Sequence, residues 1–165
     1  MSTLTSPVTQ PQVDVRGPRF AAWITTAALV VTLVVAAFSP IAAGLVLAVQ
    51  AVVFALGAFL GPRRSPYGAL FANVVAPRLS PVREREPVAQ LRFAQLVGLI
   101  FAVVGVAGYL GGLPLIGTIA TAFALIAALL NAAFGICLGC QMYPLVARLR
   151  RAPAGASPDS PTPAT

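Results

Sequence analysis

Four long apolar segments dominate the pattern of hydrophobic and polar positions along this chain. They cover residues 20–38, 41–60, 93–110 and 115–136. Each is about 20 residues long, which lets an α-helix cross the roughly 30 Å hydrocarbon layer of a bilayer. The pattern therefore predicts an all-α fold, a four-helix transmembrane bundle.

The connections group these segments into two helical hairpins. Ser39-Pro40 joins the first pair and residues 111–114 join the second, whereas the longer loop 61–92 separates the pairs. The triplet Arg-Phe-Ala opens the first and third segments, at Arg19 and Arg92, and this faint repeat suggests a duplicated hairpin in parallel orientation. Small residues recur every four positions in the last two segments, and such ridges favour close helix contact in lipid. We expect the third and fourth segments to touch along these ridges, which comprise Ala94, Gly98 and Ala102, then Gly108 and Gly112, and finally Ala120, Ala124, Ala128 and Ala132.

The central loop carries a second helical pattern. Apolar residues recur there at one-face helical spacing: Tyr67, Leu70, Phe71, Val74 and Val75. With arginines beside it, this pattern predicts a short amphipathic helix in the membrane interface, a buried or irregular loop being the alternative. Prolines then predict an extended, solvated piece around residues 83–86.

Composition agrees with a membrane protein. Of 165 residues, 58% are hydrophobic and 9% are charged, with a mean hydropathy of +0.89. Residues 13–149 form the expected membrane domain, and the polar, proline-containing tails 1–12 and 152–165 are expected to be disordered.

Arginine placement predicts the topology. All eleven basic residues are arginines, and they lie before the first segment, between the second and third, and after the fourth. Neither hairpin tip carries a charge. By the positive-inside rule both termini and the central loop are cytoplasmic. The net charge of +7 thus indicates lipid headgroups, and no nucleic-acid partner is expected.

The apolar segments contain no Asp, Glu, Lys, Arg or His. Ion-coupled transporters usually carry such a group at membrane depth, so its absence argues against that class. No acid/base pair and no phosphate-binding glycine motif is present. Asn131 projects near the last alanine ridge and is expected to form a structural hydrogen bond, with Gln50, Gln95 or a threonine such as Thr25 as candidate partners.

The chain's two cysteines, Cys137 and Cys140, form a C-x-x-C motif at the arginine-flanked end of the fourth segment. On a continuing helix they would share one face at a Cα separation of roughly 5 Å, which a disulfide tolerates. Nearby Arg148, Arg150 and Arg151 would favour thiolates, and Cys137 is named the nucleophile by analogy with other C-x-x-C motifs. Three interpretations stay open: thiol redox or sulfur relay, a soft-metal site completed by Met142 or a second chain, and inert cysteines.

Four stretches resemble one known family. They begin at Val13 (VDVRGPRFAAW), Ser65 (SPYGALF), Leu91 (LRFAQLVGLIF) and Leu129 (LLNAAFGICLGCQMY). In that order they resemble the bacterial integral-membrane family DUF4395, a domain of unknown function. The resemblance implies a four-span protein of the bacterial plasma (inner) membrane with Cys137 and Cys140 as its motif thiols. It also implies an association with thioredoxin-like proteins or sulfurtransferases.

The leading hypothesis is therefore a membrane-bound dithiol protein that exchanges electrons or sulfur with a cytoplasmic partner. The alternative is a non-enzymatic membrane scaffold or a subunit of a sulfur-compound permease. The chain is also expected to be able to form a homo-oligomer, and whether it is an enzyme stays open. No cofactor is expected unless a soft metal binds. Quinone-coupled disulfide-forming enzymes share four spans and a C-x-x-C motif, but they act on the oxidising side and usually have further cysteines. The sequence therefore ranks that analogy last.

Overall fold

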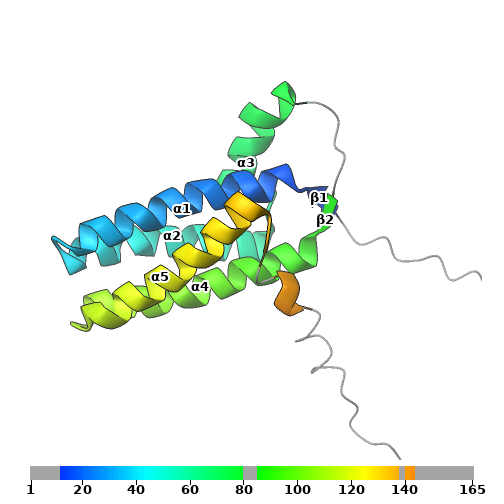
Figure 1. The fold of residues 1–165 in the computed structure, drawn as a ribbon. Helices are drawn as coiled ribbons and strands as arrows, with labels where there is room; N and C mark the ends of the chain where they lie inside the picture. The colour runs from blue at the N-terminus through cyan, green and yellow to red at the C-terminus, as the bar shows by residue number, and fades with distance from the viewer. Residues whose placement is uncertain (1–11, 80–84, 138–139, 144–165) are drawn as a thin grey trace, which may run out of the picture.

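A computed structural model describes residues 12–79, 85–137 and 140–143 of the chain. Within these residues, four helices are long and apolar enough to cross a membrane. They are α1 (Arg16–Ala36), α2 (Pro40–Leu60), α4 (Val88–Leu110) and α5 (Pro114–Phe134). They run side by side as a bundle (Figure 1), which confirms the predicted all-α fold and a multi-pass membrane protein.

Helix boundaries follow from local chemistry. Ser39 caps α2 by accepting a hydrogen bond from the Ala42 N–H at 3.3 Å, and Pro40 occupies the first turn, where no N–H is needed. Pro114 starts α5 in the same way. The second hairpin turns at Gly112, whose φ of 77° is costly for any residue with a side chain.

The four helices form a closed ring in the order α1, α2, α4, α5, in which each helix packs on two others. Both hairpin turns lie at one end of the bundle, which we call the tip end (Figure 1). The opposite end carries the described arginines and is called the arginine end. The core between the helices contains Leu29, Leu47 and Tyr109, each at most 2% exposed.

Helix α5 changes its neighbour along its length. At the tip end it contacts α4, where a Cβ at Gly108 would lie 2.5 Å from the backbone nitrogen of Gly117. At the arginine end it lies beside α1, where Arg19 donates to the carbonyl oxygen of Ala133 at 3.5 Å. The predicted contact between the third and fourth segments is therefore confirmed in the tip half. In the arginine half the ridge of α4 faces elsewhere, since Gly98 lies against Phe54 of α2.

The two hairpins use Arg19 and Arg92 in equivalent ways. Arg92 of α4 donates to the carbonyl oxygen of Ala58 at 2.8 Å and to that of Phe59, at the end of α2. Arg19 of α1 does the same for the end of α5. Each arginine thus satisfies the last carbonyls of the other hairpin, a position that also favours positive charge. This arrangement supports the repeat suggested by the sequence.

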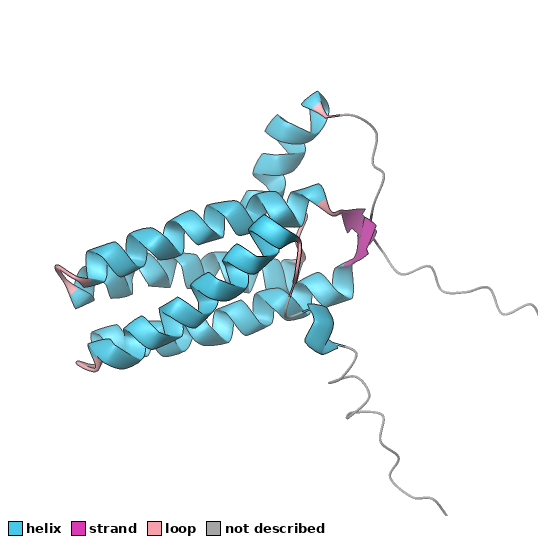
Figure 2. Ribbon diagram, in the orientation of Figure 1, coloured by secondary structure: helices cyan, strands magenta, loops and turns pink. Residues whose placement is uncertain are grey.

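Two short elements complete the arginine end. The predicted central-loop helix is present as α3 (Pro66–Leu70), continued by helical turns at Phe71–Val75 and Ala76–Arg78. Phe71 is buried against Phe20 of α1, with ring centroids 5.8 Å apart. An antiparallel pair of strands, β1 (Gln12–Asp14) and β2 (Arg85–Pro87), joins the entries to α1 and α4 (Figure 2). The sequence analysis did not predict this pair.

Candidate functional site

The segment that carries the cysteines leaves the helix before it reaches them. Helix α5 ends at Phe134, and Gly135 follows in a left-handed conformation with φ 70°. The amide N–H groups of Gly135 and Ile136 then donate to the carbonyls of Asn131 and Leu130, a glycine-based helix stop. The prediction that both cysteines share one face of a continuing helix is therefore wrong, because Gly135 redirects the chain first.

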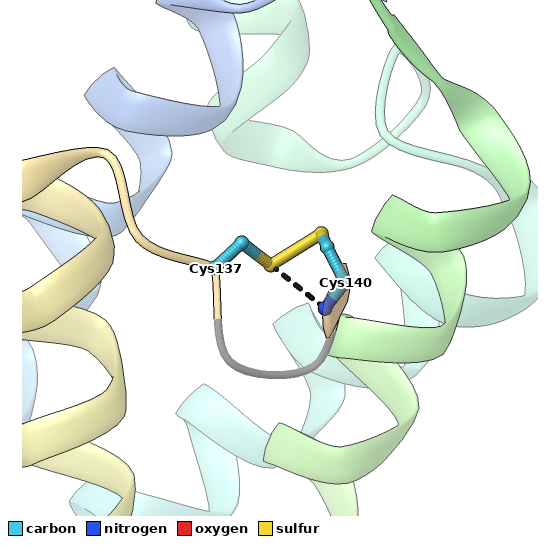
Figure 3. The surroundings of a disulfide bond; sticks show 2 residues. All are labelled: Cys137 and Cys140. Carbon is cyan, nitrogen blue, oxygen red and sulfur yellow. Dashed lines mark hydrogen bonds between the residues drawn. A yellow bond between two sulfur atoms is a disulfide. The ribbon is translucent and has the colours of Figure 1, made fainter. Parts of the chain in front are cut away.

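Cys137 and Cys140 are joined by a disulfide bond (Figure 3), with a Cα separation of 5.1 Å. The backbone N–H of Cys140 donates to Sγ of Cys137 at 3.2 Å. Residues 140–143 are helical, and the N–H of Gln141 donates to the carbonyl of Cys137. Cys137 is 8% exposed, whereas Cys140 is only partly buried. The two sulfur atoms therefore occupy different environments.

The cysteine segment, defined here as residues 135–137 and 140–143, has its two parts on different sides of the bundle. Gly135 lies beside Arg19 of α1, whose Cζ would be 3.9 Å from a Cβ at this position. At the other end of the segment, Tyr143 meets Phe93 of α4 edge-on at 5.9 Å. At the arginine end, the first part of the segment thus follows α5 on the side of α1, and the second part lies beside α4 (Figure 1).

A cavity of about 670 Å³ lies inside the arginine half of the bundle, and Cys137 is part of its wall. All four long helices contribute to it, together with the central loop and the cysteine segment. Its lining is mainly apolar, and includes Phe54, Phe101, Phe123 and Ile126. The size and character are those of a small-molecule site. No feature of the one-dimensional pattern predicted this cavity, because it depends on how α5 leans between α4 and α1.

A few polar side chains face the cavity. Thr25 lines it and is 6% exposed, and it accepts a hydrogen bond from Gln50 at 3.5 Å. Gln50 in turn accepts from the Tyr67 hydroxyl at 2.8 Å. Asn131 and Gln95 also line the cavity, and neither side chain makes a hydrogen bond to a described residue. The predicted hydrogen bond of Asn131 to Gln50, Gln95 or a threonine is not formed among the described residues, and Gln50 donates to Thr25 instead.

Charged groups of the wall lie at the arginine end. Asp14 of β1 accepts hydrogen bonds from the backbone and the guanidinium of Arg16, with an ion-pair distance of 3.0 Å. Partial burial acts to raise the pKa of Asp14, but these hydrogen bonds and the charges of Arg16 and Arg85 outweigh it. The pKa of Asp14 therefore lies below its ordinary value of 3.8, and the carboxylate is ionised at neutral pH.

The soft-metal hypothesis gains no additional ligands. Within residues 12–79, 85–137 and 140–143, no group of three or more His, Cys, Asp or Glu side chains converges. Met142, its proposed third ligand, also lines the cavity and is 50% exposed. Arg148, Arg150 and Arg151, which were expected to favour thiolates, lie outside the described residues. The arrangement that is present is a disulfide at the wall of an apolar cavity.

Comparison with known proteins identifies the family of the chain. No curated protein and no solved structure matches the chain. The model of a family described as "Domain of unknown function (DUF4395)" matches residues 13–148, which include all the described helices, β2, all of β1 except Gln12, and the cysteine pair. The chain therefore belongs to the DUF4395 family.

Proposed function

We propose that this protein is a membrane-bound dithiol–disulfide exchange protein of the bacterial plasma membrane, and that its cysteine pair faces the cytoplasm. The observation that carries the proposal is the Cys137–Cys140 bond, which lies at the arginine end of the bundle. The arginines between and beyond the spans favour retention of that end in the cytoplasm. A soluble thiol protein would reach the pair there without entering the bilayer.

The different environments of the two sulfurs give each a role. The more exposed Sγ of Cys140 accepts attack by a partner thiolate, which forms the mixed disulfide and breaks the Cys137–Cys140 bond. Cys137 leaves as a thiolate that the Cys140 N–H stabilises by its hydrogen bond. A second partner thiolate then attacks the partner sulfur of the mixed disulfide and releases Cys140. Two electrons and two protons thereby pass to the pair, and the partner leaves as a disulfide.

This assignment refines the order suggested by the sequence. Analogy named Cys137 as the nucleophile, and its hydrogen bond supports a stable thiolate there. Burial favours Cys140 as the atom that the soluble partner touches. A thioredoxin-like dithiol protein supplies both thiols that the reaction consumes. A sulfurtransferase persulfide would use the same exposed cysteine, handing its outer sulfur to the Cys140 thiolate and leaving as a thiol.

The test uses purified protein in its disulfide form and a reduced thioredoxin whose second active-site cysteine is replaced by alanine. We expect a mixed disulfide with the wild-type chain that peptide mass mapping locates on Cys140. The Cys137→Ser/Cys140→Ser chain is the control and gives no adduct. No adduct with the wild-type chain would contradict the proposal, and an adduct on Cys137 would reverse the assigned roles.

A further inference from the structure

The disulfide lies between two different environments. Cys140 is the more exposed residue of the pair, whereas Cys137 is buried and forms part of the cavity wall. When a partner on the aqueous side attacks Cys140 and reduces the disulfide, two electrons pass to the two cysteines. One of the resulting thiols, that of Cys137, therefore lies at the cavity wall. A second reactant that accepts those electrons would be held in the cavity.

The cavity extends to the lipid-facing surface. Phe123 and Ile126 lie in the middle of α5, line the cavity, and are 56% and 53% exposed. The ring of Phe123 lies 6.2 Å from that of Phe101, another lining residue on α4. These exposed residues lie at bilayer depth, so the cavity is reached from the hydrocarbon layer. A ligand that enters this way is soluble in lipid.

The wall also indicates what kind of ligand fits. Its membrane-spanning part carries no charged residue, and the charged lining groups Asp14 and Arg63 lie outside the spans. A neutral ligand is therefore favoured. Asn131 of α5 and Gln95 of α4 both line the cavity, and their side-chain amide N–H groups donate to no described residue. Aromatic rings from α2, α4 and α5 offer flat apolar surface to a planar ring.

We propose that the cavity binds a lipid-soluble quinone, which reoxidises the reduced cysteine pair. The two carbonyl oxygens of a quinone are acceptors for the amides of Asn131 and Gln95. In the reaction the two S–H bonds break and the Cys137–Cys140 bond forms. Two electrons and two protons pass to the quinone, whose carbonyl oxygens become the hydroxyls of a quinol. The inference rests on the proposed exchange reaction of the same pair, which would supply electrons from cytoplasmic thiols.

The experiment measures oxidation of the reduced chain by a quinone without oxygen. The probe is a fully substituted benzoquinone with a decyl chain, because a thiol cannot replace a ring hydrogen on it. Quinone loss is followed by ultraviolet absorbance, and disulfide formation by alkylation and mass shift. We expect one quinone consumed per disulfide formed, with a rate that saturates as the quinone concentration rises.

Two matched variants on α4 test the cavity. Ala94 lines it, so Ala94→Phe fills part of the space and is expected to slow the oxidation about tenfold or more. Ala107 is exposed on the same helix and does not line the cavity, so Ala107→Phe should leave the rate within about twofold. Exchange with thioredoxin at Cys140 should be unchanged in both, which shows that a slow variant is folded.

A second pair of changes keeps the inference testable if Ala94→Phe does not fold. Asn131→Leu and Gln95→Met keep the length of each side chain and remove the donors, so each should raise the quinone concentration that gives half-maximal rate. The inference would be overturned if the disulfide forms no faster with quinone than without it. Equal rates of oxidation in Ala94→Phe and Ala107→Phe would also overturn it. If thioredoxin exchange is normal when either of these results is obtained, the proposed function is still supported. If the quinone oxidises the cysteine pair but thioredoxin does not exchange with it, the proposed function alone would be contradicted.

Discussion

Tyr67 ties the central loop to the interior of the bundle through one hydroxyl. It donates to Gln50 at 2.8 Å, and Gln50 donates to Thr25 at 3.5 Å, so three helices share one polar chain. Burial raises the pKa of Tyr67, which keeps the hydroxyl protonated as a donor. Such bonds are valuable where unpaired polar groups cannot reach water.

Tyr67→Phe should therefore destabilise the protein by about 1 kcal/mol, since it leaves the Gln50 carbonyl without its donor. Thermal unfolding in detergent, followed by fluorescence of the single tryptophan, Trp23, would measure this. The matched control is Tyr109→Phe, whose hydroxyl lies 3.4 Å from Thr118 and is expected to contribute less. A larger loss at Tyr109 than at Tyr67 would contradict the assigned importance of the chain.

The lowered pKa of Asp14 predicts that the stability of the protein depends on pH. Its pKa is lowered in the folded protein, so its contribution is fully present above the ordinary value of 3.8. The contribution is lost as the pH falls below that value through the lowered folded pKa. Because the Asp14 side chain is 17% exposed and its partner 31%, we expect less than about 1 kcal/mol.

Unfolding midpoints measured at about pH 6 and about pH 3 would test this. The wild-type chain should lose more stability on acidification than Asp14→Asn, which lacks the titrating group. Equal losses in the two proteins would show that other groups produce the acid effect. Arg16 is not a suitable control, because its change would remove the partner of Asp14.

At the scale of helices, the backbones of α4 and α5 approach closely at Gly108. A Cβ at Gly108 would lie 2.5 Å from the backbone nitrogen of Gly117, and helix backbones cannot yield as side chains do. Gly108→Ala should therefore separate the helices and cost about 1–3 kcal/mol. Gly98→Ala is the control, because the 2.8 Å contact there is with the ring of Phe54, which can rotate. Thermal unfolding that ranks Gly98→Ala as the more harmful change would contradict this account.

The sequence predicted these helices well and their mutual arrangement poorly. Continuous apolar segments, Pro114 and the small residues of the last two spans were enough to predict the bundle and the α4–α5 contact in its tip half. The effect of Gly135 was missed, since Gly-x-Cys-x-x-Cys within an apolar context is compatible with helix until the left-handed residue is seen. The cavity was missed as well, because it arises from residues far apart in sequence that meet only when α5 leans from α4 to α1.

For the whole molecule, the proposed orientation makes the tip end external and the arginine end cytoplasmic. Phe38 and Leu113 lie at the two hairpin turns and are 86% and 56% exposed, whereas Arg64 is exposed at the other end. In a Cys137→Ser/Cys140→Ser background, Phe38→Cys and Leu113→Cys should react with a membrane-impermeant maleimide added to intact cells. Arg64→Cys should react only after the membrane is opened.

The same labelling decides whether the pair is accessible to cytoplasmic partners. The wild-type chain, reduced beforehand, should resist the reagent in intact cells and take it up at Cys140 first in opened ones, because Cys137 is the more buried. Labelling of Arg64→Cys from outside would show that the orientation is the reverse of the one proposed. It would place the disulfide on the oxidising side, where exchange with cytoplasmic thiols is impossible although the cavity and its access from lipid would be unchanged.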